Sequence, residues 1–193
     1  RGAGVGTRAG FESVRESIRN LPENHRQRYE FHGSGLLDGI ATIAYPGFGA
    51  YVARSQRLYV AIRCGRIHPL GPGAHAHNDQ LAIELWIAGR KLVTDPGTWV
   101  YTPLPEERNR YRSVAAHFAP RVADREPSRL DEGLFFLRDT SQANCLYFGS
   151  HGFAGEHGGF GAPVRRAISF EADRLIVEDG SFVTLETAWG DDA

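Results

Sequence analysis

The sequence predicts an all-β protein folded as an antiparallel β-sandwich. Short apolar runs alternate with turn signals along most of the chain, and its 193 residues include 23 glycines, 10 prolines and 11% aromatic residues. These features favour short strands joined by tight turns over a helical bundle. The clearest strand is 81–87, in which Leu81, Ile83, Leu85 and Ile87 fall at every second position and therefore share one face.

Length and charge limit the classes of function. The chain is long enough for one domain with a substantial core. It carries 22 basic and 23 acidic residues, for a net charge of -1, so it lacks the global field that nucleic acid or an anionic membrane would select. No apolar run reaches the length of about 18 residues that a spanning helix needs. We therefore expect no nucleic-acid partner and no membrane span, and we expect Cys64 and Cys145 to be buried free thiols.

The chain is expected to divide into residues 1–30, a linker or short helical arm, and residues 31–193, the sandwich. Phe11, Val14 and Ile18 are spaced i, i+3, i+7, which predicts one short amphipathic helix within the arm. The charged residues 24–28 are interpreted as a solvated face. The last residues contain no obvious closing strand, which leaves open a sandwich that is incomplete at its C-terminus.

A second set of strands follows from the apolar runs between turn signals. Ala88-Gly89 is read as a hairpin tip, which makes Ala82 face Asp95 and puts Asp95 at the same end of the hairpin as the loop that carries two histidines. Residues 101–112 are expected to form a loop with one helical turn, and the glycine-dense residues 149–161 a further loop. The remaining expected strands are 40–45, 50–53, 58–64, 90–94, 134–137, 144–148, 164–170 and 175–178.

One constellation of residues has the composition of a metal and acid/base site. His75 and His77 lie two residues apart, Asp95 follows in an Asp-Pro-Gly turn, and His117 closes the segment. Neutral imidazoles and a carboxylate are usual zinc ligands, and two histidines at i, i+2 of an extended segment point the same way. The alternative is that these polar loop histidines bond only to nearby backbone.

Two families that use a His-X-His pair do not match the spacing. A cupin jelly roll needs a glutamate three or four residues after the second histidine, and the nearest, Glu84, is too far along. An amidohydrolase barrel needs eight βα units, which 193 residues with little helix cannot supply.

The central segment of the chain resembles that of heparinase II/III-like polysaccharide lyases. The order and spacing of the motifs match over about 45 residues, 73–117, and weaker similarity extends from about Tyr45 to Asp179. The matching motifs are Gly73-Ala74-His75-Ala76-His77-Asn78-Asp79-Gln80, Glu84-Leu85-Trp86, Gly89-Arg90, Asp95-Pro96-Gly97-Thr98, Tyr101, Arg108-Asn109, Arg112-Ser113 and Ala116-His117.

This resemblance implies a β-sandwich that follows an (α/α) toroid domain, with an acidic, uronate-containing polysaccharide in the cleft between them. It implies that His75 is the catalytic residue facing the sugar, and that His77, Asp95 and His117 bind a zinc ion that braces the site. Partners are then the polysaccharide and a helical toroid domain outside this chain, in a periplasmic or secreted protein. The motif positions expected to support the turn are Asn78, Asp79 and Gln80.

The implied reaction is β-elimination, in which the proton α to a uronate carboxylate is abstracted and the C4 oxygen is expelled. Such chemistry needs neutralisation of the developing negative charge and a base that titrates near neutrality, a role that suits His75. Arg108 and Arg112 are candidate clamps for the substrate carboxylate, with surface solvation as the alternative. Tyr101 either stacks on a sugar or fills the core.

Two departures from the family pattern leave other functions open. The family continues His-Asn-Thr after the third ligand, whereas this chain has His117-Phe118-Ala119-Pro120, which changes the support of the metal ligands. The partner tyrosine and asparagine belong to the toroid, so this chain would hold half an active site. The alternatives are a non-catalytic carbohydrate-binding or structural module of the same shape, and a stand-alone metal hydrolase whose metal keeps an open water position.

Overall fold

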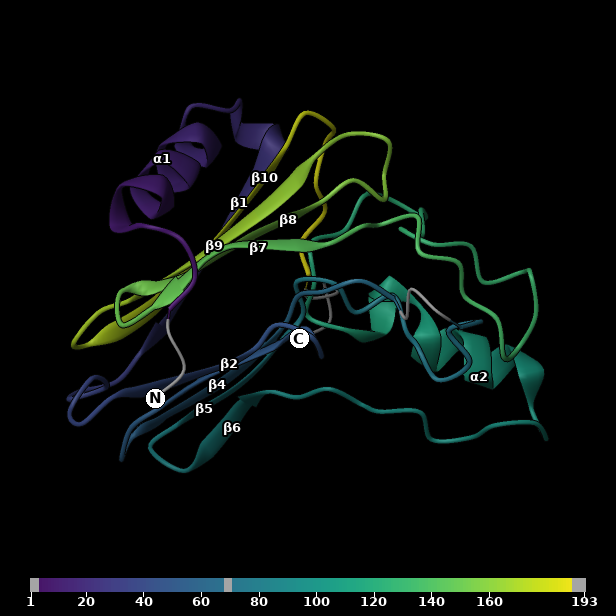
Figure 1. Ribbon diagram of the computed structural model, residues 1–193, viewed down its shortest axis with the longest axis horizontal. Helices are drawn as coiled ribbons and strands as arrows, with labels where there is room; N and C mark the ends of the chain where they lie inside the picture. The colour runs from purple at the N-terminus through teal and green to yellow at the C-terminus, as the bar shows by residue number, and fades with distance from the viewer. Residues whose placement is uncertain (1–3, 68–70, 189–193) are drawn as a thin grey trace.

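The computed structural model describes residues 4–67 and 71–188 and confirms the antiparallel β-sandwich. Two five-stranded sheets pack face to face (Figure 1). Sheet A has the order β1-β10-β9-β8-β7, with bounds β1 (Arg26–His32), β7 (Asn144–Gly149), β8 (Gly152–His157), β9 (Val164–Phe170) and β10 (Arg174–Ser181). Sheet B has the order β2-β3-β4-β5-β6, with bounds β2 (Ala41–Tyr45), β3 (Ala50–Arg54), β4 (Leu58–Arg63), β5 (Ile83–Ile87) and β6 (Arg90–Val93).

The core lies between the sheets because sheet B alternates apolar and exposed positions. Along β4, Leu58, Val60 and Ile62 are buried while the residues between them are not, as expected for a sheet with one solvated face. From β3, the ring of Tyr51 contacts two rings of sheet A, with centroid distances of 5.3 Å to Phe148 and 5.7 Å to Phe153.

The predicted N-terminal helix is confirmed as α1 (Arg8–Arg19), which covers the outer face of sheet A (Figure 1). Thr7 caps it by accepting from the backbone N–H of Gly10 at 3.1 Å. Phe11 and Ile18 are both 1% exposed, and Phe11 stacks on Tyr147 at 4.8 Å. Because α1 removes this face from water, β9 and β10 are buried on both sides.

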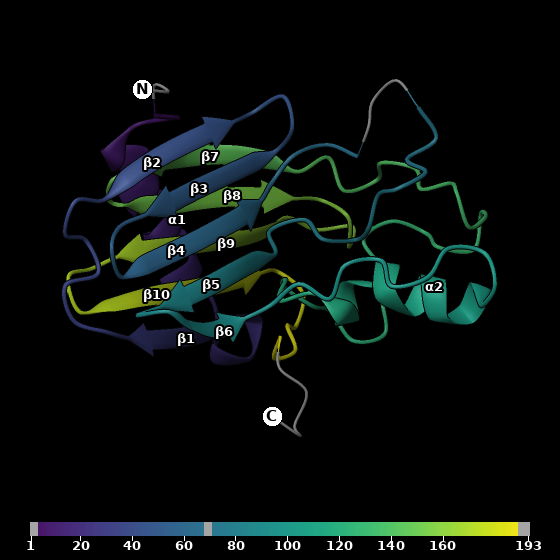
Figure 2. The ribbon, with the colours of Figure 1, turned by 90° about the horizontal axis from the view of Figure 1, so that it is seen from below.

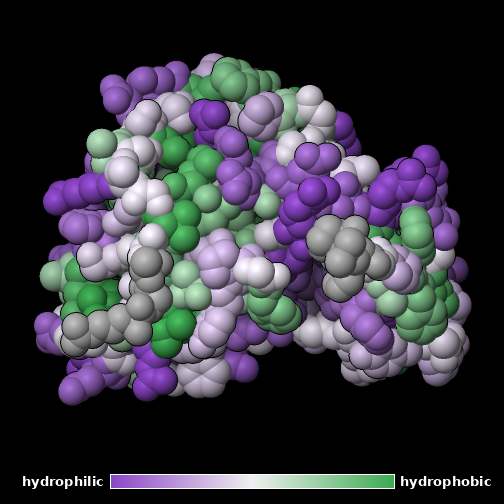
Figure 3. Space-filling model, viewed as in Figure 1, coloured by the Kyte–Doolittle hydropathy of each residue, from purple (hydrophilic) through white to green (hydrophobic). Residues whose placement is uncertain are grey.

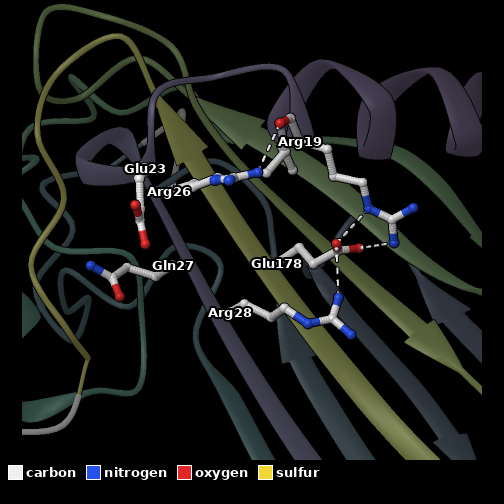
Figure 4. A pocket seen from close by; sticks show the side chains of 7 residues that line it. Arg19, Glu23, Arg26, Gln27, Arg28 and Glu178 are labelled. Atoms are coloured by element: carbon white, nitrogen blue, oxygen red, sulfur yellow. Dashed lines mark hydrogen bonds and ion pairs between the residues drawn. The ribbon is translucent and has the colours of Figure 1, made fainter.

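A carboxylate at the base of α1 ties the helix to sheet A. The side chain of Glu178 is 4% exposed and accepts hydrogen bonds from Arg15, Arg19 and Arg28 at 2.7 to 3.2 Å. Figure 4 shows two of these arginines pointing at Glu178 from the helix and from β1, with Arg26 directed at the backbone of Arg19. Arg19, Arg28 and Glu178 are among the residues that border a cavity of about 490 Å³ on the outer face of sheet A.

Strand β1 begins at Arg26, within the segment expected to be an arm, and pairs with β10 along its whole length. Of the charged residues 24–28, the first two lie in a 3₁₀ turn, and Arg26 and Arg28 lie on the exposed face of this edge strand. Its other face contributes Tyr29 and Phe31, whose rings lie 5.0 and 6.1 Å from that of Phe118. The sandwich therefore includes part of the segment expected to be an arm.

Two other expectations about strands are wrong. Residues 149–161 contain β8, because the glycines there permit close packing: a Cβ on Gly152 would lie 2.9 Å from the ring of Phe11, and one on Gly155 would lie 3.0 Å from the sulfur of Cys64. Residues 134–137 are not a strand. Carbonyls of this segment accept instead from buried arginine side chains, as described below.

The hairpin β5–β6 confirms Ala88-Gly89 as its tip, with φ of 51° and 78°. Ile87 pairs with Arg90 as expected. A bulge next to Leu85 shifts the register, so that Leu85 pairs with Val93 and the expected pairing of Ala82 with Asp95 is not continued. Asp95 still follows the end of β6 near the start of β5.

The remaining loops gather at one end of the sandwich with α2 (Pro105–Arg112) and the 3₁₀ turn η2 (Val114–Ala116), as Figure 2 shows; a second 3₁₀ turn, η1 (Glu23–His25), precedes β1. On the face in Figure 3 the surface is indented at its lower margin between the sandwich and this loop region. Cys64 and Cys145 are free thiols, buried and half-buried. Within the described part of the chain, no helix is long and apolar enough to cross a membrane.

Candidate functional site

His117 and Asp95 form the centre of the candidate site. Asp95 begins the Asp-Pro-Gly turn, in which its Oδ1 accepts from the backbone N–H of Gly97 at 2.8 Å. Its Oδ2 lies 2.6 Å from Nδ1 of His117, whose side chain is fully buried. Burial, the largest single influence, raises the pKa of Asp95, but the hydrogen bond and charge of His117 and the N–H of Gly97 together outweigh it, so the pKa lies below its ordinary value. The ionised carboxylate therefore accepts a hydrogen bond from Nδ1–H, which in the neutral imidazole leaves the lone pair of His117 on Nε2.

His77 lies beside this pair. Its ring centroid is 5.4 Å from that of His117, and its Nε2 is 3.2 Å from the hydroxyl of Thr98. Burial, reinforced by the charge of His117, lowers the pKa of His77 to about 4. His77 is therefore neutral near pH 7, which is the form that binds metal ions.

One observation supports zinc binding by these residues, and another does not. Nε2 of His117 is buried and has no hydrogen-bond partner among the described residues. This is the usual arrangement of a metal-binding histidine, in which a carboxylate orients one ring nitrogen and the other nitrogen binds the metal. Within residues 4–67 and 71–188, however, no three His, Cys, Asp or Glu side chains are arranged to hold an ion. Asp95 is placed as the hydrogen-bond partner of His117.

Asn78 and Glu126 fix the backbone around these histidines. Asn78 is fully buried and donates to the carboxylate of Glu126 at 2.6 Å. The same carboxylate accepts from the hydroxyl of Ser113 and from the backbone N–H of Val114. Glu126 thus links the His77 loop to the turn before His117. Sequence reasoning missed Glu126, since it lies in a charged segment that resembles an ordinary surface loop.

His75 is exposed, two residues before the buried His77. The carbonyls on either side of it are bound by two buried arginines: Arg108 Nη2 donates to Ala74 O at 2.8 Å, and Arg112 Nε donates to Ala76 O at 3.3 Å. The loop that presents His75 is therefore held from beneath at both flanking peptide groups.

Arg108 and Arg112 are both 0% exposed, so neither is a solvated surface residue and neither can bind the substrate carboxylate directly at the surface. Arg108 also donates to Leu134 O. Arg112 donates to Asn109 Oδ1 on its own helix and to three carbonyls of the loop before β7, those of Gly133, Leu134 and Phe136. Among the described residues, neither guanidinium is paired with a carboxylate. Two buried positive charges beneath His75 are consequently uncompensated.

Tyr101 lies at the surface, 47% exposed, so it is not a core residue. Its ring meets the ring of His75 edge-on at 5.8 Å and lies nearly parallel to that of Phe135, at 6.4 Å and 8°. Phe135 was missed by sequence reasoning because its segment was interpreted as a strand of the core.

Comparison with known proteins decides the family. The family model described as Heparinase II/III-like, C-terminal, matches residues 39–182, which is 144 of the 193 residues. The chain belongs to this family. No curated protein matches the chain. A solved structure of a heparinase III gene product with methylated lysines has a TM-score of 0.54 and 16% sequence identity, over 89% of this chain and 27% of that chain. The heparinase II/III-like chain thus spans about a quarter of that protein, and at this identity the likeness shows the fold alone.

This heparinase II/III-like domain uses the residues after His117 for packing. The ring of Phe118 is buried against Tyr29 and Phe31 of β1, and its carbonyl accepts from Nη1 of Arg166 at 2.6 Å. The apolar side chain that stands where the family has asparagine therefore anchors the segment in the core. It makes this contact with β1, the strand that the sequence did not reveal.

Proposed function

We propose that this heparinase II/III-like domain serves in the cleavage of an acidic, uronate-containing polysaccharide by β-elimination, with His75 as the group that moves the proton. The observation that carries the proposal is the position of His75. It is exposed above two buried guanidinium groups, Arg108 and Arg112, that have no carboxylate partner among the described residues.

The positive charge of Arg108 and Arg112 beneath His75 is suited to an acidic, uronate-containing substrate. A buried charge acts in a medium of low polarity, so its field reaches further than that of a solvated surface arginine. It attracts the carboxylate of a uronate and stabilises negative charge that develops on that carboxylate as the C5 proton leaves. Because backbone carbonyls fix both guanidinium groups, they need not reorganise during the reaction.

The bond changes of the proposed step are as follows. The imidazole of His75 accepts the proton from C5 of the uronate, the electron pair left behind forms the C4–C5 double bond, and the C4–O bond breaks. The leaving oxygen then takes a proton from an acid. The family resemblance places a partner tyrosine for this role in a helical domain, and the 27% share of the heparinase III chain that this domain covers leaves room for one.

We further propose that His77, Asp95 and His117 form the binding place of a zinc ion that braces the site. This assignment is supported by the buried Nε2 of His117, which has no hydrogen-bond partner in the described part of the chain, and by the neutral form of His77. A bound zinc ion would supply structural cross-linking between the loops and no step of the elimination.

The lyase proposal is tested on this domain together with the helical domain proposed to supply the acid, by ultraviolet absorbance of the unsaturated uronate product, with hexasaccharides of hyaluronan, heparan sulfate and polymannuronate as substrates. We expect product from at least one of them, none from the His75→Ala variant, and unchanged product from the control His32→Ala, an exposed histidine on β1. Binding of the hexasaccharides with no product would favour the non-catalytic carbohydrate-binding module, for which the exposed ring of Tyr101 is the supporting observation.

The zinc proposal is tested by elemental analysis of the purified chain, together with its melting temperature with and without chelator. We expect close to one zinc ion per chain, lost in His77→Ala and His117→Ala but kept in His32→Ala, and a lower melting temperature after chelation. A well-folded chain without zinc would refute the assignment and leave the lyase proposal standing.

A further inference from the structure

We propose that Tyr101 and Phe135, here called the aromatic platform, stack against one pyranose ring of an acidic polysaccharide immediately beside His75. The choice of an acidic polysaccharide as ligand rests on the proposed function. The platform would be an additional sugar-binding subsite next to the one at His75. Tyr101 belongs to the segment after β6 and Phe135 to the loop before β7, so the fold brings together two rings that are distant in sequence.

The two rings are held parallel at the surface. Their planes differ by 8° at a centroid distance of 6.4 Å, and the side chains are 47% and 40% exposed. Single exposed rings are common on protein surfaces, whereas adjacent exposed rings with polar groups around them often mark a ligand site. Two rings are too small an area for a stable protein interface, which buries above about 1,000 Å², but they match the size of one sugar ring.

Arg108 makes the platform rigid and cationic. Its Cζ lies 5.0 Å from the ring centroid of Tyr101 and 4.8 Å from that of Phe135, so one guanidinium spans both rings. The group is itself fixed by Leu134 O, next to Phe135 in the chain, and by Ala74 O, next to His75. Its Nη1 is buried without a hydrogen-bond partner among the described residues.

These features select an acidic sugar over a neutral or purely apolar ligand. The C–H face of a pyranose packs on the exposed ring faces while its hydroxyl groups stay in water, and its carboxylate is drawn to the charge of Arg108. The ring of Tyr101 lies 5.8 Å from that of His75. A sugar on the aromatic platform is therefore a neighbour of the sugar that His75 would deprotonate.

Nuclear magnetic resonance titration of the ¹⁵N-labelled chain with the three uronate hexasaccharides and with neutral cellohexaose tests this proposal. We expect the resonances of His75, Tyr101 and Phe135 to shift with a uronate hexasaccharide and less with cellohexaose. Tyr101→Ala and Phe135→Ala should weaken binding at least about fivefold, while Tyr101→Phe should retain it. The matched control is Tyr59→Ala, which removes a 39% exposed ring near the start of β4.

Three results would overturn the platform: no hexasaccharide binds, the shifted resonances lie elsewhere, or both alanine variants bind as tightly as the wild type while melting normally. The titration is repeated in the His75→Ala background, which separates it from the lyase proposal. Platform-dependent binding without cleavage, with the helical domain also present, would refute catalysis and keep the platform. Cleavage with an unchanged KM in the platform variants would refute the platform and keep catalysis.

Discussion

The guanidinium of Arg112 connects two loops that lack regular secondary structure. It donates to Ala76 O in the His75 loop and to three carbonyls, of Gly133, Leu134 and Phe136, in the loop before β7. Carbonyl groups buried in irregular loops need such donors, because no strand or helix satisfies them. The planar fork of arginine reaches several acceptors at once, which lysine cannot do.

We therefore expect Arg112→Lys to lower the free energy of unfolding by about 3 kcal/mol, since a charged hydrogen bond contributes about 1.5–3 kcal/mol and more than one is lost. Urea unfolding followed by circular dichroism measures this. The control is Arg110→Lys on the same helix, whose exposed side chain pairs with Glu107 at 3.3 Å and lies 5.7 Å from the ring centroid of Tyr111. This substitution should change the unfolding free energy by less than about 0.5 kcal/mol. Equal effects of the two substitutions would contradict the role given to Arg112.

At the scale of residues, the sequence predicted which titratable groups gather but not what holds them. His77, Asp95 and His117 lie together as their order in the chain suggested. Arg108 and Arg112 were expected near the substrate at the surface, because a segment so rich in charge normally faces solvent. Their burial depends on carbonyl acceptors in an irregular loop, and no residue type in the sequence marks those acceptors.

Among the elements, α1 depends on a buried carboxylate as well as on its apolar stripe. Burial alone would raise the pKa of Glu178, but hydrogen bonds from Arg19 and Arg15 outweigh it, so the pKa lies below the ordinary value of 4.5. A carboxyl whose pKa is depressed by folding stabilises the native state above its ordinary pKa, and this contribution is lost as the pH falls through the native-state value.

The expected result is a fall in the stability of the wild type below about pH 4.5 and a weaker fall in Glu178→Gln. At pH 7 the substitution should reduce the free energy of unfolding by about 2 kcal/mol, because three arginines lose their anionic partner. Urea unfolding from pH 3 to 7 is the measurement, with Glu12→Gln, a 49% exposed partner of Arg15, as control. Identical pH profiles for wild type and Glu178→Gln would show that the cluster contributes nothing.

The elements that the sequence did not reveal share a physical cause. In β8, Gly152 and Gly155 suggested a loop, but both are required by close packing against Phe11 and Cys64. In β1, charge on the exposed face concealed an alternating strand whose partner, β10, lies about 150 residues away in the chain. The local amino-acid composition indicates how flexible and how polar a segment is. Whether these two segments form strands depends instead on residues that are distant in the sequence.

At the scale of the whole molecule, a buried ion pair of sheet A contacts the segments that lead into β5 and out of the candidate site. Arg166 of β9 is bound by Asp179 of β10 at 2.7 Å through both carboxylate oxygens, and both residues are buried. Its Nη1 also donates to Leu81 O, ahead of β5, at 2.7 Å and to Phe118 O, next to His117, at 2.6 Å. Sheet A thus anchors both loops that carry the candidate site.

Arg166→Met should therefore lower the free energy of unfolding by about 3–5 kcal/mol, because it leaves the charge of Asp179 buried and unpaired. The double variant Arg166→Met, Asp179→Leu removes that charge and should recover at least half of the loss. Urea unfolding of the two variants and of Asp179→Leu alone gives the coupling between them. A loss below about 1 kcal/mol in Arg166→Met would contradict the anchoring role.

The most direct test of the central claim is the mass of the products that this domain, together with the helical domain proposed to supply the acid, forms from a uronate hexasaccharide as the wild type and as His75→Ala. Elimination adds no water, so the masses of the two fragments should sum to the mass of the hexasaccharide, and His75→Ala should form neither fragment. Fragments whose masses sum to that of the hexasaccharide plus one water would instead identify a hydrolase. Equal cleavage by the two proteins would contradict the assignment of His75 as the residue that moves the proton.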